Sequence, residues 1–153
     1  MRRDPMAMKP FCGYNFADYF AHWLSFDGPG AQLPRVFHVN WFRKDQDGHF
    51  LWPGFGENLR VLEWMIERVE NRVEAVETPI GFLPIIDALN LDGTGLSDEA
   101  RKQLLNVDHQ GWAQEMEGIA AYLCDFGARL PGALKAEQEK ILALLSRDFS
   151  GSD

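Results

Sequence analysis

Aromatic side chains crowd the first part of this chain, whereas acidic side chains dominate the rest. Fourteen of the nineteen aromatic residues lie between Phe11 and Trp64. Residues 1–60 carry seven Lys or Arg against six Asp or Glu, a net charge of +1, and residues 61–153 carry eight against seventeen, a net charge of −9. Near-neutral aromatic sequence packs a core or lines a ligand pocket, whereas acidic helical sequence is typical of a solvated face. The asymmetry predicts that any binding chemistry lies in the first part.

The overall composition excludes several classes of protein. The chain has 153 residues, of which 46% are hydrophobic, and its net charge is −8. This length suits one compact domain that buries about 70% of its unfolded surface. A pI near 4.9 argues against a nucleic-acid partner, because phosphate backbones select basic surfaces. No stretch approaches the ~20 apolar residues of a membrane-spanning helix. The composition therefore predicts an acidic globular domain with neither nucleic acid nor membrane as a partner.

The cysteines and the N-terminal segment bear on the cellular compartment. Cys12 and Cys124 have no partner at metal-ligand spacing, and two thiols in a domain of this size are typical of a reducing compartment. The N-terminal segment is basic, but Asp4 and Pro5 stand where an export signal needs its apolar run. We therefore expect a cytoplasmic protein.

Helical and strand periodicities alternate in the first part of the chain. Apolar residues at helical spacing predict a helix over residues 14–26, with Asn15 as its N-cap. Residues 36–42 are rich in β-branched and aromatic side chains and predict a strand. Asp47 and Gly48 form a turn signal, after which residues 50–52 could return as a second strand. A β-hairpin is therefore expected here.

The rest of the chain is mostly helical in pattern. The clearest predicted helix covers residues 59–73, and it is followed by an extended crossing at 78–84. Ser97 is a predicted N-cap for a third helix. Two further apolar stripes, over residues 112–123 and 134–145, predict the last two helices, with Pro131 in the first turn of the final one. The fold class is therefore a mixed α/β (α+β) domain, helix-rich, with a short β-hairpin and about five helices.

The common catalytic motifs are absent from this sequence. It contains no GxxxxGK[ST] phosphate loop, no HExxH, no CxxC and no GxSxG. The four histidines are scattered, and none pairs with a cysteine or carboxylate at ligand spacing. The acidic residues 92–99 lack the alternating ligands of an EF-hand calcium loop. The sequence therefore predicts neither a catalytic residue nor a metal ligand in this chain.

An aromatic cluster precedes the helix that begins near Asn58. Its members are Trp41, Phe42, Phe50, Trp52 and Phe55. The adjoining Gly54-Phe55-Gly56 lacks the third glycine and the βαβ setting of a dinucleotide fingerprint. One explanation is a hydrophobic hairpin packed on its neighbouring helix. The other is a slot in which aromatic faces stack on a purine, while the Asn58 amide donates to a guanine carbonyl, where adenine would present a donor. The residue types leave both explanations open.

Three long strings resemble one enzyme family in order and in detail. They are RRDPMAMKPFCGYNFADYFAHWL, LPRVFHVNWFRKDQDGHFLWPGFGEN and ETPIGFLP. Together they closely resemble the C-terminal end of bacterial GTP-dependent phosphoenolpyruvate carboxykinases. The resemblance runs from Arg2 to about Leu91 and becomes looser from Ser97 onward.

The resemblance implies a function and a set of site residues. The family converts oxaloacetate and GTP into phosphoenolpyruvate, GDP and carbon dioxide in gluconeogenesis, with manganese and magnesium ions. In the family, guanine lies between phenylalanines, which match Phe42, Phe50 and Phe55 here. The string Phe55, Gly56, Glu57 and Asn58 matches the guanine-contacting segment, in which Asn58 reads the base. The complete enzyme is expected to be a cytoplasmic monomer.

Absences from the family pattern imply that this chain is a part of such an enzyme. The family's phosphate loop, metal ligands, reactive cysteine and substrate arginines would precede Met1. We therefore expect residues 1–153 to form a single partial domain that supplies the guanine pocket and is inactive alone. The alternatives are a stand-alone guanine-nucleotide-binding or protein-interaction module without catalysis, and a purely structural role for the aromatic residues. The reading frame upstream of Met1 would discriminate between them.

Overall fold

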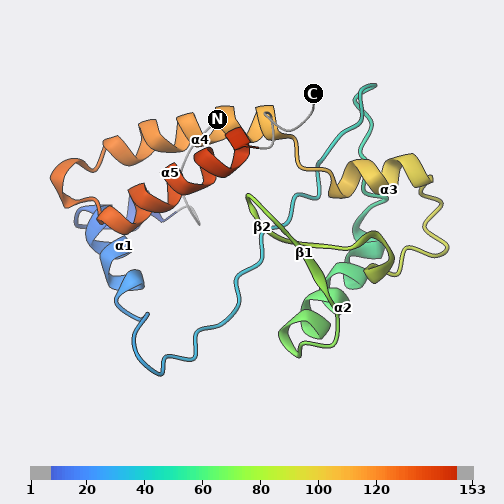
Figure 1. The fold of residues 1–153 in the computed structure, drawn as a ribbon, viewed down its shortest axis with the longest axis horizontal. Coiled ribbons are helices and arrows are strands. Elements are labelled where there is room, and N and C mark those ends of the chain that lie inside the picture. Colours follow the sequence, from blue (N-terminus) through green and yellow to red (C-terminus); the bar gives the residue numbers. More distant parts are fainter. Residues whose placement is uncertain (1–7, 148–153) are drawn as a thin grey trace. The chain divides into compact units, whose positions relative to one another are not determined.

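A computed structural model describes residues 8–147 of the chain (Figure 1). The described part contains five α-helices and one two-stranded antiparallel sheet. The helices are α1 (Phe16–Leu24), α2 (Asn58–Val69), α3 (Asp98–Leu105), α4 (His109–Cys124) and α5 (Gly132–Arg147), and the strands are β1 (Ala75–Thr78) and β2 (Gly81–Pro84). This architecture confirms the predicted mixed, helix-rich class, but its hairpin lies at residues 75–84 and not at 36–52. The N-terminal residues on which the export-signal argument depends lie outside the described part.

The chain divides into two compact units. Met1–Pro34 and Asp108–Asp153 form what we name the helical unit, and Arg35–Val107 forms what we name the hairpin unit. Each unit is described below by itself. The expectation of a single partial domain stays a prediction.

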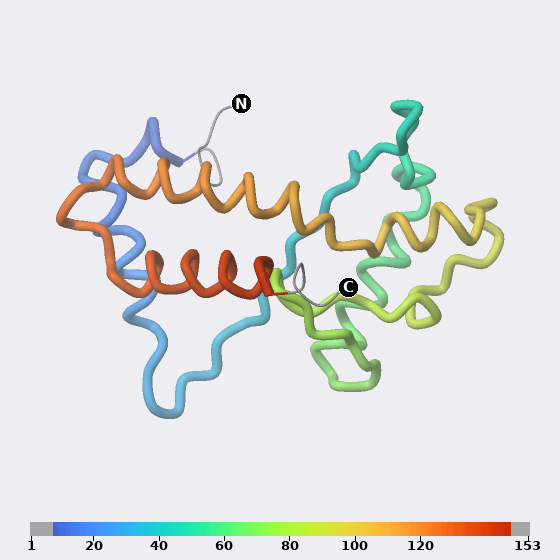
Figure 2. The backbone as a smooth tube through the Cα atoms, turned by 45° about the horizontal axis from the view of Figure 1, so that its top comes forward, coloured from blue at the N-terminus to red at the C-terminus, as the bar shows by residue number. Residues whose placement is uncertain are grey.

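In the helical unit, α4 and α5 run antiparallel and side by side (Figures 1 and 2). The start of α1 packs against the end of α4, where Phe16, Ala17, Leu123 and Phe126 form a buried cluster. Asn15 is the N-cap of α1, and its Oδ1 accepts from the Ala17 N–H at 2.9 Å. A side-chain oxygen in this position satisfies an amide that has no partner within the helix. The predicted first helix and its cap are confirmed.

In the hairpin unit, β1 and β2 pair antiparallel, with Thr78 opposite Gly81. The prediction of a plain extended crossing at 78–84 was therefore wrong. Pro79 lies in the turn between the strands, where its fixed φ and missing N–H carry no penalty. Gly81 follows at a φ of 117°, a value that favours glycine. Pro79 therefore marks the reversal of the chain between the end of β1 and the start of β2.

The hairpin predicted over residues 36–52 was also wrong in its strands but right in its turn. The structure has no strand there, and one isolated bridge joins Lys44 to Phe50. The turn closes through the Asp45 N–H, which donates to the His49 carbonyl at 2.9 Å, and Gly48 adopts a φ of 86°. β-Propensity reflects packing against neighbouring strands, and residues 36–42 have no neighbouring strand with which to pair.

Helix boundaries follow local caps. α2 ends at Val69, four residues before the predicted end, because Asn71 turns to a φ of 57°. The Arg35 guanidinium donates to the Arg68 carbonyl and to Asn71 Oδ1, both at 2.7 Å, and so satisfies the end of the helix. Ser97 is the N-cap of α3 as predicted, since its Oγ accepts from the Ala100 N–H at 3.1 Å.

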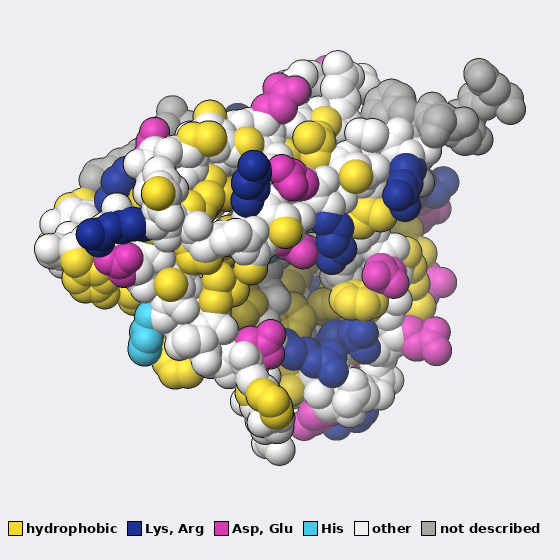
Figure 3. All heavy atoms as spheres, turned by 60° about the vertical axis from the view of Figure 1, so that its left-hand side comes forward, with side chains coloured by type: hydrophobic (Ala, Val, Ile, Leu, Met, Phe, Trp, Pro, Cys, Tyr) yellow, Lys and Arg dark blue, Asp and Glu magenta, His cyan; other side chains and the backbone are white. Residues whose placement is uncertain are grey.

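Apolar side chains are not all buried in these units. On the face drawn in Figure 3, hydrophobic side chains lie at the surface among charged ones. Along α2, the exposed members are Leu59, Leu62, Ile66 and Val69. Among the described helices, none has the length and apolar character needed to cross a membrane.

Candidate nucleotide site

Three phenylalanines of the hairpin unit face solvent. The exposed fractions of Phe42, Phe50 and Phe55 are 73%, 57% and 91%. The rings of Phe42 and Phe50 lie 6.0 Å apart between centroids and meet edge to face. Lys44 Nζ lies 5.0 Å from the centroid of the Phe50 ring, a cation–π distance. Clustered aromatic surface of this kind is typical of a binding site rather than of a solvated surface.

A tight turn holds the Phe42 and Phe50 rings beside each other. The Leu51 N–H donates to the Arg43 carbonyl at 2.8 Å, which closes the base of the turn. At its tip, Asp45 Oδ1 accepts from the N–H groups of Asp47 at 3.0 Å and His49 at 2.8 Å. These bonds, chiefly the one from the His49 backbone, favour the ionised carboxylate and lower the pKa of Asp45.

The base of the same turn is tied to α3. Arg43 is half-buried, and its Nη1 donates to the Asn106 carbonyl at 2.8 Å and to the Leu104 carbonyl at 3.3 Å. The carbonyls at the end of a helix lack partners within the helix, so a guanidinium there satisfies them and complements the helix dipole. The turn beside the Phe42 and Phe50 rings is therefore closed by its own hydrogen bonds and tied to α3 through Arg43.

Asn58 is the first residue of α2, and its side chain has a defined partner. Trp52 Nε1 donates to Asn58 Oδ1 at 2.8 Å. Trp52 is only 7% exposed, and its ring lies 5.7 Å from that of Trp41. The indole thereby fixes the amide at the N-terminus of α2.

The remaining predicted site residues form the 3₁₀ turn that leads into α2. Gly54 precedes this turn at a φ of 136°, a conformation that a side chain would strain. The Glu57 carboxylate is paired with Arg60, whose Nη1 donates to the Asn90 carbonyl at 2.7 Å. The Glu57 carboxylate is therefore already paired within the hairpin unit. Gly56 is exposed, and no atom beyond the residue itself and its two chain neighbours lies within 4 Å of where its Cβ would stand.

The structure brings together only some of the predicted site residues. Phe42 and Phe50 are in contact, and Asn58 is oriented by Trp52. The Phe55 ring has no ring partner among the described residues. The prediction from the sequence missed the role of Trp52, although its position six residues before Asn58 placed it in the same aromatic cluster.

The turn also contains one group of metal-type ligands. Asp45, Asp47 and His49 each bring a ligand atom within 4.8 Å of the others. Both Asp45 oxygens already have partners, since Oδ1 accepts two backbone N–H groups and Oδ2 lies 3.6 Å from His49 Nδ1. Mn²⁺ and Mg²⁺ prefer octahedral oxygen coordination, in which water joins carboxylate oxygens that are not already bonded within the protein. This exposed group does not fit such an ion.

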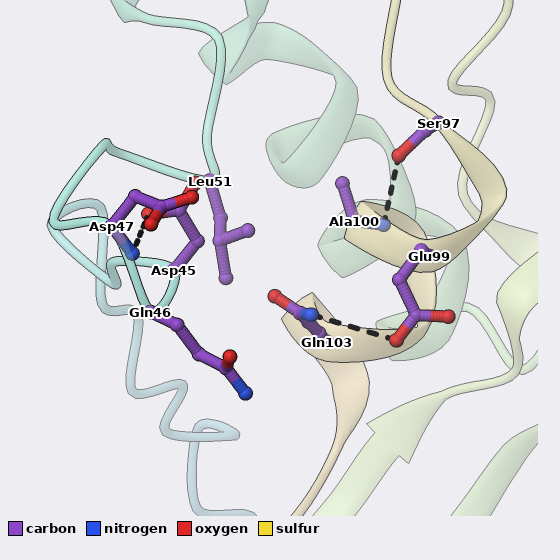
Figure 4. Close-up of a pocket in the computed structure, with 8 residues that line it drawn as sticks. All are labelled: Asp45, Gln46, Asp47, Leu51, Ser97, Glu99, Ala100 and Gln103. Atoms are coloured by element: carbon purple, nitrogen blue, oxygen red, sulfur yellow. Dashed lines mark hydrogen bonds between the residues drawn. The ribbon is translucent and has the colours of Figure 1, made fainter.

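A pocket of about 230 Å³ lies between the turn and α3 (Figure 4). Its lining comprises Asp45, Gln46, Asp47, Leu51, Ser97, Glu99, Ala100 and Gln103. Three of these side chains are carboxylates and none is a cation, so the pocket disfavours phosphate. The sequence did not indicate it, because the pocket depends on how α3 packs beside the turn.

The amino-acid sequence of the chain is similar to that of a known enzyme family. A family-wide profile described as the phosphoenolpyruvate carboxykinase C-terminal P-loop domain matches residues 1–143. Phosphoenolpyruvate carboxykinase [GTP] of Chlamydia muridarum is 54% identical over 142 residues, which cover 92% of this chain and 24% of that protein. The enzyme of Renibacterium salmoninarum is 52% identical over 141 residues, covering 91% of this chain and 23% of the relative. That of Thermoplasma volcanium is 50% identical over 127 residues, covering 83% and 21%.

These relatives share one name, and the similarity extends over nearly the whole chain. The chain spans about a quarter of their length, 24% in the first case. The matched region includes both the turn that carries Phe42 and Phe50 and the start of α2. The chain therefore belongs to the GTP-dependent phosphoenolpyruvate carboxykinase family, and its residues 1–143 match that family's C-terminal P-loop domain.

Proposed function

We propose that this chain supplies the guanine-binding site of a GTP-dependent phosphoenolpyruvate carboxykinase. That enzyme converts oxaloacetate and GTP into phosphoenolpyruvate, GDP and carbon dioxide. The observation that carries the proposal is an oriented amide, Asn58, at the start of a helix that follows exposed phenylalanines. The printed name of the relatives supports GTP as the nucleotide.

The proposed site recognises the base by two kinds of contact. Phe42, Phe50 and Phe55 hold the purine between their rings, and stacking of a base on an aromatic side chain is worth about 1–3 kcal/mol. The Asn58 Nδ2 donates to the O6 carbonyl of guanine, where adenine carries an amino group. Stacking supplies affinity for any purine, and the amide supplies selectivity.

The phosphoryl-transfer chemistry is proposed to depend on groups outside this chain. Such transfer relies on positioning and on charge stabilisation by metal ions and cationic groups. The sequence has no phosphate-loop motif, and the described residues provide no fitting site for Mn²⁺ or Mg²⁺. We therefore propose that oxaloacetate, phosphoenolpyruvate and both metal ions bind elsewhere in the complete enzyme. The chain alone is proposed to lack carboxykinase activity.

The remaining expectations concern the cellular location, the partners and the oligomeric state of the protein. The two cysteines are free thiols in the structure, which supports a reducing, cytoplasmic location. The acidic composition supports the proposal that nucleic acid is not a partner. The complete enzyme is proposed to act as a monomer.

Nucleotide binding by the full 153-residue chain tests the proposed function. Ligand-observed NMR detects affinities in the millimolar range, and it should show stronger binding of GDP than of ADP. Circular dichroism on the same sample would establish that the chain is folded. Equal binding of the two nucleotides, or no binding by a folded sample, would contradict the proposal. A carboxykinase assay on the same sample should show no turnover.

A further inference from the structure

We propose that Trp52 determines guanine selectivity without touching the base. Its buried indole N–H holds the Asn58 amide in the one orientation that accepts guanine and rejects adenine. Trp52 is thus a positioning residue that acts through Asn58. The inference rests on the proposed guanine site and deepens it.

The chemistry of the indole determines which end of the amide faces Trp52. An indole nitrogen carries one hydrogen and accepts no hydrogen bond, so its partner must be an acceptor. The atom 2.8 Å from Trp52 Nε1 is therefore the amide oxygen Oδ1 of Asn58, and the Nδ2 group points away. The two ends of an amide are nearly indistinguishable by shape, but the donor at position 52 distinguishes them.

Burial makes this orientation hard to reverse. Trp52 is 7% exposed, follows the buried Leu51 and lies against the Trp41 ring. A rotation of the Asn58 amide by half a turn would bring its NH₂ group against the indole N–H. Two donors would then face each other, and a buried N–H would lose its only acceptor, an arrangement that proteins avoid. The amide is therefore held with its donor end free.

The free donor matches only one of the two purines. At position 6, guanine carries a carbonyl oxygen that accepts, and adenine carries an amino group that donates. Asn58 Nδ2 can bond to the first but would face a second donor in the second. An amide free to rotate could offer its oxygen to adenine instead. The rejection of adenine thus depends on the group that prevents the rotation.

The chain provides a matched control for a change at Trp52. Trp64 is also buried, with an exposed fraction of 5%, and it lies in the same unit. Within the described residues, its Nε1 has no hydrogen-bond partner. Replacing Trp64 therefore removes a buried indole of the same size without releasing any amide.

The experiment compares W52F and W64F with the unaltered chain. Ligand-observed NMR on the full chain would measure the dissociation constants of GDP, IDP and ADP, and circular dichroism would verify folding. We expect the preference for GDP over ADP to fall about tenfold in W52F, the effect of one hydrogen bond, and to remain unchanged in W64F. The preference for IDP over ADP should fall equally, because IDP shares the carbonyl at position 6.

A tryptophan analogue tests the N–H alone. Benzothienylalanine at position 52 replaces the indole N–H by sulfur and keeps the ring volume, so it serves also if W52F does not fold. It should reproduce the loss of selectivity. Unchanged selectivity with this analogue would overturn the inference. If the unaltered chain shows no preference for GDP, the proposed guanine site itself is wrong, which is a different result.

Discussion

The two units of this protein use aromatic side chains in opposite ways. In the helical unit, Phe16 is 4% exposed and its ring contacts those of Phe20 and Phe126. In the hairpin unit, Phe42 and Phe55 stand in solvent. Burial of a phenylalanine contributes about 1.5–3 kcal/mol, so each exposed ring forgoes stability that the helical unit obtains. The same residue type is therefore a core residue in one unit and an exposed residue, proposed to bind the base, in the other.

The helical unit should lose the most when a ring is removed. We expect Phe16→Ala to lower the free energy of unfolding by about 3–5 kcal/mol, because it leaves a cavity among packed rings. Chemical denaturation followed by circular dichroism would measure this effect. Phe11→Ala is the control, since Phe11 is exposed, and it should change stability by no more than about 0.5 kcal/mol. If both variants changed stability by a similarly small amount, the contribution of the buried Phe16 ring to the core would be contradicted.

The hairpin unit should lose binding rather than stability when a ring is removed. We expect Phe55→Ala to weaken GDP and ADP binding alike by about 1–3 kcal/mol, the value of one stacking contact. Its unfolding free energy should change by no more than about 0.5 kcal/mol, since the Phe55 side chain is exposed. Phe55→Tyr, which retains the ring, should bind almost normally. A large loss of stability in Phe55→Ala would place this ring with the core residues.

Asn58 should separate selectivity from affinity within the hairpin unit. Asn58→Ala removes the proposed bond to guanine, and we expect the preference for GDP over ADP to fall by about 1 kcal/mol. It also leaves Trp52 Nε1 without its acceptor, so a loss of stability should accompany it. Asn106→Ala is a control, because the bond from Arg43 uses the Asn106 backbone and not its side chain. Unchanged selectivity in Asn58→Ala would show that Asn58 does not read the base.

The smallest expected effect concerns the turn that carries Phe42 and Phe50. Hydrogen bonds, first from the His49 N–H, lower the pKa of Asp45 below its ordinary value of 3.8. A lowered pKa means that the ionised carboxylate stabilises the turn fully above pH 3.8, and that this contribution is lost as the pH falls through the lower value.

NMR titration of the His49 amide would measure this pH dependence. We expect its chemical shift to change with a midpoint below 3.8. Asp45→Asn retains the oxygen acceptor but removes the charge, so the transition should disappear while the turn remains. A midpoint above 3.8 would contradict the stabilising role of the carboxylate.

Local signals in the sequence were sufficient for much of the fold. Asn15 and Ser97 were predicted as N-caps and occupy those positions, because a cap bonds to amides two or three residues away. Asp47 and Gly48 likewise indicated a turn that forms. The strand predicted at 36–42 does not form, because β-propensity alone does not supply a strand with which to pair. The pattern at 78–84 predicted an extended crossing, although the two strands of the hairpin at residues 75–84 are joined by a short turn at Pro79. Caps and turns bond within a few residues, whereas pairing also requires a partner strand.

At the candidate site, the sequence alone also left open how the five clustered aromatic residues are arranged. Their spacing left open both a packed hairpin and a base-binding slot. The structure divides them, since Trp52 is buried against Trp41 whereas Phe42, Phe50 and Phe55 face solvent. Neither explanation described the whole cluster, because one part of it packs and orients Asn58 while the other part is exposed.

By itself, the sequence determined the presence of the five helices, the N-caps of α1 and α3, the turn at residues 45–49 and the carboxykinase family, since these depend on adjacent residues or on matching strings. Only the tertiary structure decided which aromatic rings are buried and which end of the Asn58 amide is free. Burial depends on contacts between residues distant along the chain, and amide orientation depends on the one donor that packing brings within bonding distance.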